Sequence, residues 1–173
     1  MTKLLDFPKE VNDTSARIVA AGAVTMSVAY AVTGWGWILV PLAYGFVARV
    51  ASGPRFSPLG LLATKVVTPR LTGISHRIVP GPPKRFAQAI GALFSLTAAA
   101  LHLADASTAA RIVAAALAGP AFLEAAFGFC VGCKMFAGLI RVGVIPESVC
   151  AECSDISARL AAQRQAHETA SNH

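Results

Sequence analysis

Residues 112–136 read IVAAALAGPAFLEAAFGFCVGCKMF, an apolar run that ends at a pair of cysteines, Cys130 and Cys133. The run from Ile112 to Phe129 contains one charged residue, Glu124. A transmembrane helix needs about 20 predominantly apolar residues, with a range of roughly 17–25. The stretch therefore predicts a membrane-spanning helix that carries two thiols where it ends.

Three further apolar runs precede this one, at Ile18 to Thr33, Trp35 to Val50 and Phe86 to Ala104. All four runs are rich in Ala, Gly, Ser and Thr, the small residues that let membrane helices approach closely. The first two runs are slightly short, so we expect Arg17 and Arg49 at their ends to extend toward the interface and place their charges there. The pattern predicts an all-α membrane protein, a four-helix transmembrane bundle.

The overall composition also favours a membrane protein. Of the 173 residues, 55% are hydrophobic and 14% are charged, and the mean hydropathy is +0.59. Soluble domains carry roughly 25% charged residues, and a globule of this size buries only about two thirds of its surface. The formal charge of +6 comes from Lys and Arg beside the apolar runs. We therefore expect membrane lipid, and not nucleic acid, as a partner.

The basic residues set the predicted orientation. The connection from Ser52 to Arg85 carries six Lys and Arg residues and no Asp or Glu, whereas residues 105–110 carry no Lys or Arg. Cytoplasmic loops of membrane proteins hold an excess of Lys and Arg, so this basic connection is predicted to be cytoplasmic. Both termini and all four cysteines then lie on the same cytoplasmic side.

The chain is predicted to form one domain. Residues 1–160 make the four-span unit, and the polar residues 161–173 make a flexible tail. Within the basic connection, Ser57 and Pro58 are typical of a helix start, and the apolar spacing after them predicts a short amphipathic helix in the headgroup layer. Residues 29–31 resemble a signal-peptide cleavage pattern, but the basic n-region of signal peptides is absent, so we expect the first span to be retained.

The four cysteines form two C-x-x-C pairs, Cys130 with Cys133 and Cys150 with Cys153, and the 16 residues from 134 to 149 separate the pairs. Thiols stay reduced in the cytoplasm, which favours metal binding or thiol chemistry over structural disulfides. Four thiolates at this spacing could bind one structural zinc ion, with Gly132 helping a tight turn between the first two sulfurs. Alternatively, each pair could form and exchange a disulfide.

Two charged residues lie close to the first pair in sequence. Lys134 follows Cys133 directly and is expected to favour its thiolate. Glu124 lies within a span, where a carboxylate is costly and needs a partner. The candidates at the same depth are Arg17, Gln88 and Arg85. On an unbroken helix, Cys130 lies about 120° around the axis from Glu124, so we expect Glu124 to have a structural role and not to relay protons.

Five motifs along the chain are distinctive: Phe7-Pro8, Gly53 to Gly60, Pro80 to Gln88, Gly128 to Lys134, and Ile145 to Cys150. Together they resemble a bacterial membrane family catalogued as domain of unknown function 4395, over about residues 6 to 156. The resemblance implies a four-span inner-membrane protein with two cysteine pairs. Family members occur near thioredoxin-like or sulfurtransferase proteins, which implies thiol or sulfur handling with a soluble partner of that kind.

Three functions are compatible with these features, and they differ in whether the chain is an enzyme. The first is thiol–disulfide or sulfur-relay chemistry, with Cys130 and Cys133 near the membrane and Cys150 and Cys153 as the exchanging pair. The second is a non-enzymatic membrane scaffold whose four cysteines bind a structural zinc ion. The third is transport of a small sulfur-containing solute, which the scarcity of polar residues in the spans disfavours. We expect the first.

Overall fold

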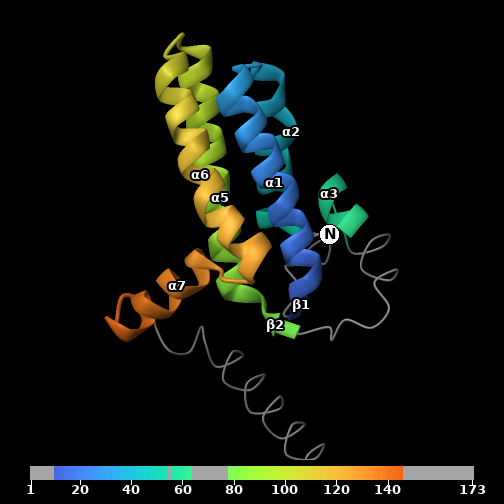
Figure 1. Ribbon diagram of the computed structural model, residues 1–173. Coiled ribbons are helices and arrows are strands. Elements are labelled where there is room, and N and C mark those ends of the chain that lie inside the picture. The colour runs from blue at the N-terminus through green and yellow to red at the C-terminus, as the bar shows by residue number, and fades with distance from the viewer. Residues whose placement is uncertain (1–9, 54–55, 64–77, 146–173) are drawn as a thin grey trace, which may run out of the picture.

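The computed structural model describes residues 10–53, 56–63 and 78–145, and its main body is a bundle of four apolar helical segments (Figure 1). The bundle is built from α1 (Asp13–Thr33), the 3-10 turn η2 (Gly36–Ile38) with α2 (Leu39–Ser52), α5 (Gly81–Leu103) and α6 (Ser107–Phe127). A shorter helix, α7 (Val131–Arg141), lies at the end of the bundle where α6 stops. The predicted all-helical architecture is confirmed.

Three of these helices, α1, α5 and α6, are long and apolar enough to cross a membrane, which suggests a multi-pass membrane protein. The helical segment Gly36–Ser52 is also apolar but shorter. At 1.5 Å per residue it would be about 25 Å long, against a hydrocarbon thickness of about 30 Å. Large apolar side chains such as Val40, Leu93 and Ile112 are exposed on the outside of the bundle, as a lipid-facing surface requires.

Two of the helices, α1 and α5, begin earlier than the apolar runs that predicted them. α1 begins at Asp13 and not at Ile18, because Asn12 caps it by accepting a hydrogen bond from the Thr14 N–H at 2.9 Å. α5 begins at Gly81 and not at Phe86. In both helices a more polar first turn precedes the apolar residues, and hydropathy alone cannot detect such a turn.

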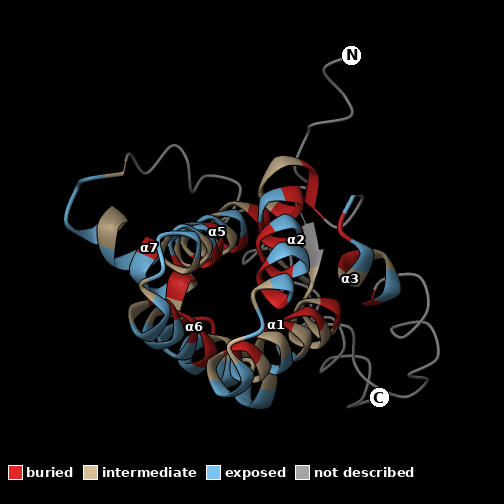
Figure 2. Cartoon of the chain, turned by 90° about the horizontal axis from the view of Figure 1, so that it is seen from above, coloured by how far each residue is buried: buried red, intermediate tan, exposed pale blue. Residues whose placement is uncertain are grey.

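The bundle consists of two helical hairpins, α1 with α2 and α5 with α6 (Figure 2). Its main contacts join the hairpins, because α1 packs along α6 and α2 packs along α5. Small buried residues such as Ala23, Ala98 and Ala114 allow this close approach. At the end away from α7, the Tyr30 hydroxyl is hydrogen-bonded to His102 Nδ1 at 3.0 Å, a further link between the hairpins.

Two short strands, β1 (Glu10–Asn12) and β2 (Ile78–Pro80), form an antiparallel pair that the sequence analysis missed. Glu10 is opposite Pro80, and Asn12 is opposite Ile78. Because β1 leads directly into α1 and β2 leads directly into α5, this pairing brings the first turns of the two helices together. Each strand is only three residues long, which is too short for an alternating pattern of apolar and polar residues to predict it.

Only part of the basic connection belongs to the described residues. Ser57 caps α3 (Pro58–Leu61), its hydroxyl accepting from the Gly60 N–H at 3.2 Å, which confirms the predicted helix start. The rest of the predicted amphipathic helix falls on residues 64–77, and the predicted tail falls on residues 161–173. Both lie outside the described residues.

Candidate dithiol site

The first cysteine pair opens a new helix. α6 ends at Gly128, which adopts a left-handed conformation with φ of 67° and donates its N–H to the Glu124 carbonyl. Cys130 is then the N-cap residue of α7, and its Sγ accepts a hydrogen bond from the Cys133 N–H at 3.4 Å. The expectation of an unbroken helix through Cys130 is therefore wrong, because Gly128 reverses the backbone two residues earlier.

The two sulfurs of this pair lie together. The Cys133 thiol donates to Cys130 Sγ across 2.7 Å, and both cysteines are free. Cys130 is buried, whereas Cys133 is partly exposed. The structure thus brings together the two sulfurs of the first C-x-x-C pair. The second pair, Cys150 and Cys153, lies outside the described residues.

The hydrogen bond between the two thiols gives them different pKa values. The hydrogen bond from the Cys133 thiol lowers the pKa of Cys130, against the opposing effects of burial and of the Glu124 carboxylate. The Lys84 ammonium and the Cys133 backbone N–H also lower it. The pKa of Cys133 is raised, because its proton is bonded to Cys130 and because the thiol is buried. Cys130 is therefore the sulfur that ionises first, and Cys133 keeps the proton.

The charge beside the dithiol is Lys84, in the first turn of α5, a residue that sequence reasoning placed only at the edge of a span. Lys84 is 4% exposed. Its Nζ donates to Glu124 Oε1 at 2.5 Å and to Asp13 Oδ1 at 3.3 Å. Asp13 and Lys84 meet because the β1–β2 pairing joins the starts of α1 and α5. The contact between Asp13 and Lys84 could have been predicted from the sequence only if the β1–β2 pairing had been known.

The partners predicted for Glu124 have other roles, so those expectations were wrong. Arg17 donates its Nε and Nη2 to the carbonyls of Ala125 and Ala126, at 3.1 and 2.7 Å. It therefore satisfies carbonyl groups at the end of α6, which a helix leaves without partners. The remaining two candidates also bond elsewhere: Arg85 to the Val50 carbonyl, and Gln88 to Arg49.

Arg49 does not extend to the interface as predicted, because it is 4% exposed and lies inside the bundle. Its Nε donates to Gln88 Oε1 at 2.9 Å, and its Nη1 donates to Ser57 Oγ at 3.1 Å. The guanidinium also lies over the Phe46 ring, 4.6 Å from the ring centroid. These contacts compensate for the burial of the charge.

Gly132 and Lys134 flank Cys133 in α7. Gly132 is helical and does not make the tight turn that was predicted. Its lack of a side chain matters because a Cβ at this position would lie 2.6 Å from the Ala87 Cβ and 2.7 Å from the Ala87 Cα. α7 can thus approach α5 closely only because residue 132 lacks a side chain. The Lys134 Nζ lies over the Phe129 ring, 5.8 Å from its centroid. The predicted effect of Lys134 on the Cys133 thiolate stays a prediction.

The sequence of these elements matches a protein family model described as Domain of unknown function (DUF4395) over residues 11–141. The chain belongs to the DUF4395 family. The resemblance inferred from the motifs is thereby confirmed. No curated protein and no solved structure gives a significant match. The range matched to DUF4395 includes the four bundle helices, α7 and the first cysteine pair.

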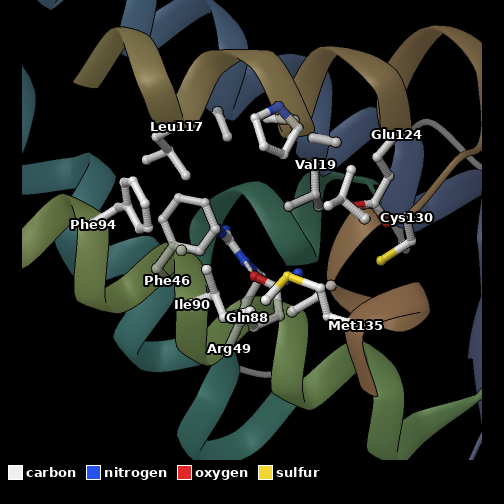
Figure 3. Close-up of a pocket in the computed structure, with 18 of the residues that line it drawn as sticks. Val19, Phe46, Arg49, Gln88, Ile90, Phe94, Leu117, Glu124, Cys130 and Met135 are labelled. Atoms are coloured by element: carbon white, nitrogen blue, oxygen red, sulfur yellow. Dashed lines mark hydrogen bonds between the residues drawn. The ribbon is translucent and has the colours of Figure 1, made fainter. Parts of the chain in front are cut away.

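A cavity of about 240 Å³ lies between the four bundle helices and α7 of this DUF4395 protein (Figure 3). Cys130 and Glu124 lie at one end of it in this view, and Phe46 and Phe94 lie toward the other. Most of the lining is apolar, but the side chains of Arg49 and Gln88 also border it. The cavity therefore connects the candidate dithiol to the interior of the bundle.

The zinc prediction for this DUF4395 chain needs all four cysteines. Among the residues that the structure describes, no three His, Cys, Asp or Glu side chains are grouped so that they could hold a metal ion. Cys150 and Cys153 are not among those residues. The four-cysteine zinc site is therefore still a prediction.

Proposed function

We propose that this DUF4395 protein is a dithiol–disulfide protein of the bacterial inner membrane, which exchanges electrons or sulfur with a soluble partner at the cytoplasmic surface. A thioredoxin-like protein or a sulfurtransferase is the kind of partner expected. The observation that carries the proposal is the Cys130–Cys133 geometry, with the sulfurs 2.7 Å apart and Cys130 at the start of α7.

This geometry suits thiol exchange because it assigns a different role to each sulfur. A thiolate is the attacking form of cysteine. Cys130 is the sulfur whose pKa is lowered, so it makes the first attack on a partner disulfide. Cys133 lies at hydrogen-bond distance, so it can then attack Cys130 Sγ and release the partner as a reduced thiol. Disulfide exchange proceeds through such a mixed disulfide.

The cytoplasmic placement rests on the distribution of basic residues. The six basic residues between Ser52 and Arg85 favour a cytoplasmic position for the loop end of the bundle. α7 begins at the same end (Figure 1). In this arrangement all four spans cross the membrane, and Cys150 and Cys153 follow on the same side, as a second pair that can exchange with Cys130 and with the partner.

The experiment is a combined count of metal and thiols on protein purified in detergent under anaerobic, chelator-free conditions, followed by titration in a glutathione redox buffer. The proposal expects no stoichiometric metal and a Cys130–Cys133 disulfide that forms and is reduced reversibly. The double variant Cys150→Ser/Cys153→Ser is the matched control, since it leaves only the first pair. About one zinc per chain, with thiols that react only after chelation, would replace the proposal with the structural-zinc scaffold.

A further inference from the structure

The cavity beside Cys130 has the properties of a site for a small ring that arrives from lipid. Much of its lining is contributed by α1, α5 and α6, the helices long enough to cross a membrane, and most of it is apolar. Its volume of about 240 Å³ lies below the roughly 300–1,000 Å³ of pockets for drug-sized ligands. The cavity can therefore accept one six-membered ring with small substituents.

Three polar side chains border this mostly apolar space: Glu124, which is paired with Lys84, and Arg49 and Gln88, which contact each other. Arg49 uses Nε and Nη1 in hydrogen bonds and Gln88 uses Oε1, so the Arg49 Nη2 and the Gln88 amide nitrogen make no hydrogen bond among the described residues. Both atoms are donors only. A carbonyl oxygen of a ligand in the cavity could accept hydrogen bonds from them.

Only one sulfur of the dithiol reaches the cavity. Cys130 belongs to its lining and Cys133 does not. Cys130 is also the sulfur that accepts the hydrogen bond from the Cys133 thiol and ionises first. A ligand in the cavity therefore meets the reactive sulfur, while a soluble partner would approach the pair from the other side, where Cys133 is partly exposed.

We propose that this cavity binds the ring of a lipid-soluble quinone, with Arg49 and Gln88 donating to one carbonyl oxygen, and that the quinone oxidises Cys130 and Cys133 to a disulfide. The inference rests on the proposed dithiol function and adds its electron acceptor. The quinone tail would leave the bundle between helices into lipid.

The reaction balances as a two-electron, two-proton transfer. The Cys130 thiolate adds to a ring carbon, and a ring oxygen takes the proton of Cys133. The Cys133 sulfur then attacks Cys130 Sγ, the sulfur–carbon bond breaks, and its electron pair returns to the ring. The ring takes up the proton first released by Cys130 and leaves as a hydroquinone, so two S–H bonds are replaced by one S–S bond. The exchange with the soluble partner then runs in the reverse direction: the partner's dithiol reduces the Cys130–Cys133 disulfide through a mixed disulfide and leaves oxidised.

The test uses the reduced full chain in detergent without oxygen, with decylubiquinone as the probe, because its fully substituted ring resists permanent alkylation by thiols. We expect one quinone to be reduced for each Cys130–Cys133 disulfide formed, measured by quinone absorbance and by mass spectrometry of alkylated thiols. The variant Ala20→Phe fills the cavity from α1, where Ala20 is 7% exposed. Its matched control is Ala21→Phe, one residue away and exposed.

Oxidation by the water-soluble reagent diamide separates this inference from the function on which it rests. We expect the dithiol of Ala20→Phe to be oxidised by diamide but no longer by decylubiquinone. The dithiol of Ala21→Phe should be oxidised by both reagents. Ala121→Phe fills the cavity from α6 and serves if Ala20→Phe does not fold. Equal quinone rates in the filled and control variants, or oxidation by diamide alone in the wild type, would overturn the quinone site and leave the dithiol function standing. If neither reagent forms the disulfide, the dithiol function itself fails, and the quinone site with it.

Discussion

At the scale of single residues, the acidity of Cys130 depends on groups that are distant in sequence. Lys84 is 46 residues before Cys130, yet its ammonium lowers the pKa of that thiol. Lys134, which is adjacent to Cys133, lies over the Phe129 ring instead. Proximity in sequence and proximity in space thus point to different lysines.

Replacing Lys84 should raise the pKa of Cys130, because the substitution removes a positive charge that favours the thiolate. At a pH below this pKa, Lys84→Met should therefore be alkylated more slowly by iodoacetamide than the wild type, measured as the rate against pH for each cysteine. Loss of one partner from a buried ion pair costs about 3–5 kcal/mol, so the double variant Lys84→Met/Glu124→Gln is used as well, because it leaves the net charge of the site unchanged. Lys134→Met is the control, and a larger shift in that variant would favour the original sequence prediction.

The two cysteines should behave differently in trapping experiments. In Cys133→Ser, Cys130 remains able to attack a partner disulfide, but no second thiol can release the partner, so a mixed disulfide should accumulate. In Cys130→Ser, Cys133 loses its hydrogen bond to Cys130, but burial still raises the pKa of the Cys133 thiol, so less adduct should form than in Cys133→Ser. Non-reducing gels with an oxidised thioredoxin as probe give the measurement. Equal trapping by both variants would contradict the assigned roles.

At the scale of elements, the position of α7 depends on its contact with α5. Gly132→Ala would place a methyl group 2.6 Å from the Ala87 Cβ, too close for the helices to keep their spacing. Overpacking of this kind costs about 1–3 kcal/mol, and α7 carries Cys130 with it when it moves. We expect a lower melting temperature in detergent and slower disulfide formation. Gly138→Ala, in the same helix with no atom within 4 Å of the added methyl group, should change neither.

The helices themselves were largely predictable, and the contacts between them were not. Hydropathy located all four apolar segments, and the cap residue Ser57 marked the start of α3. The break at Gly128 was missed because a glycine in an apolar run reads equally well as part of a span. Likewise the burial of Arg49 was missed because it depends on partners in other elements, Gln88 and Ser57.

At the scale of the whole molecule, the orientation can be tested with single new cysteines. In a background with the four natural cysteines replaced by serine, Thr33→Cys and Ser107→Cys mark the end of the bundle opposite α7, and Met135→Cys marks α7 itself. A membrane-impermeant maleimide should label the first two from the periplasmic side of spheroplasts. Position 135 should react only in inverted vesicles. The reverse pattern would place the dithiol outside the cytoplasm.

The way the hairpins pack also bears on how the chain could be divided. Each hairpin packs mainly against the other, since α1 packs on α6 and α2 packs on α5. A cut in the connection between α3 and β2 would separate the chain into two fragments, each with one hairpin and one strand of the β1–β2 pair. Neither fragment can cover its own core, so the two halves should be obligate partners. Co-expressed, they should reassemble into one molecule, and the fold would serve as a split reporter inside a membrane.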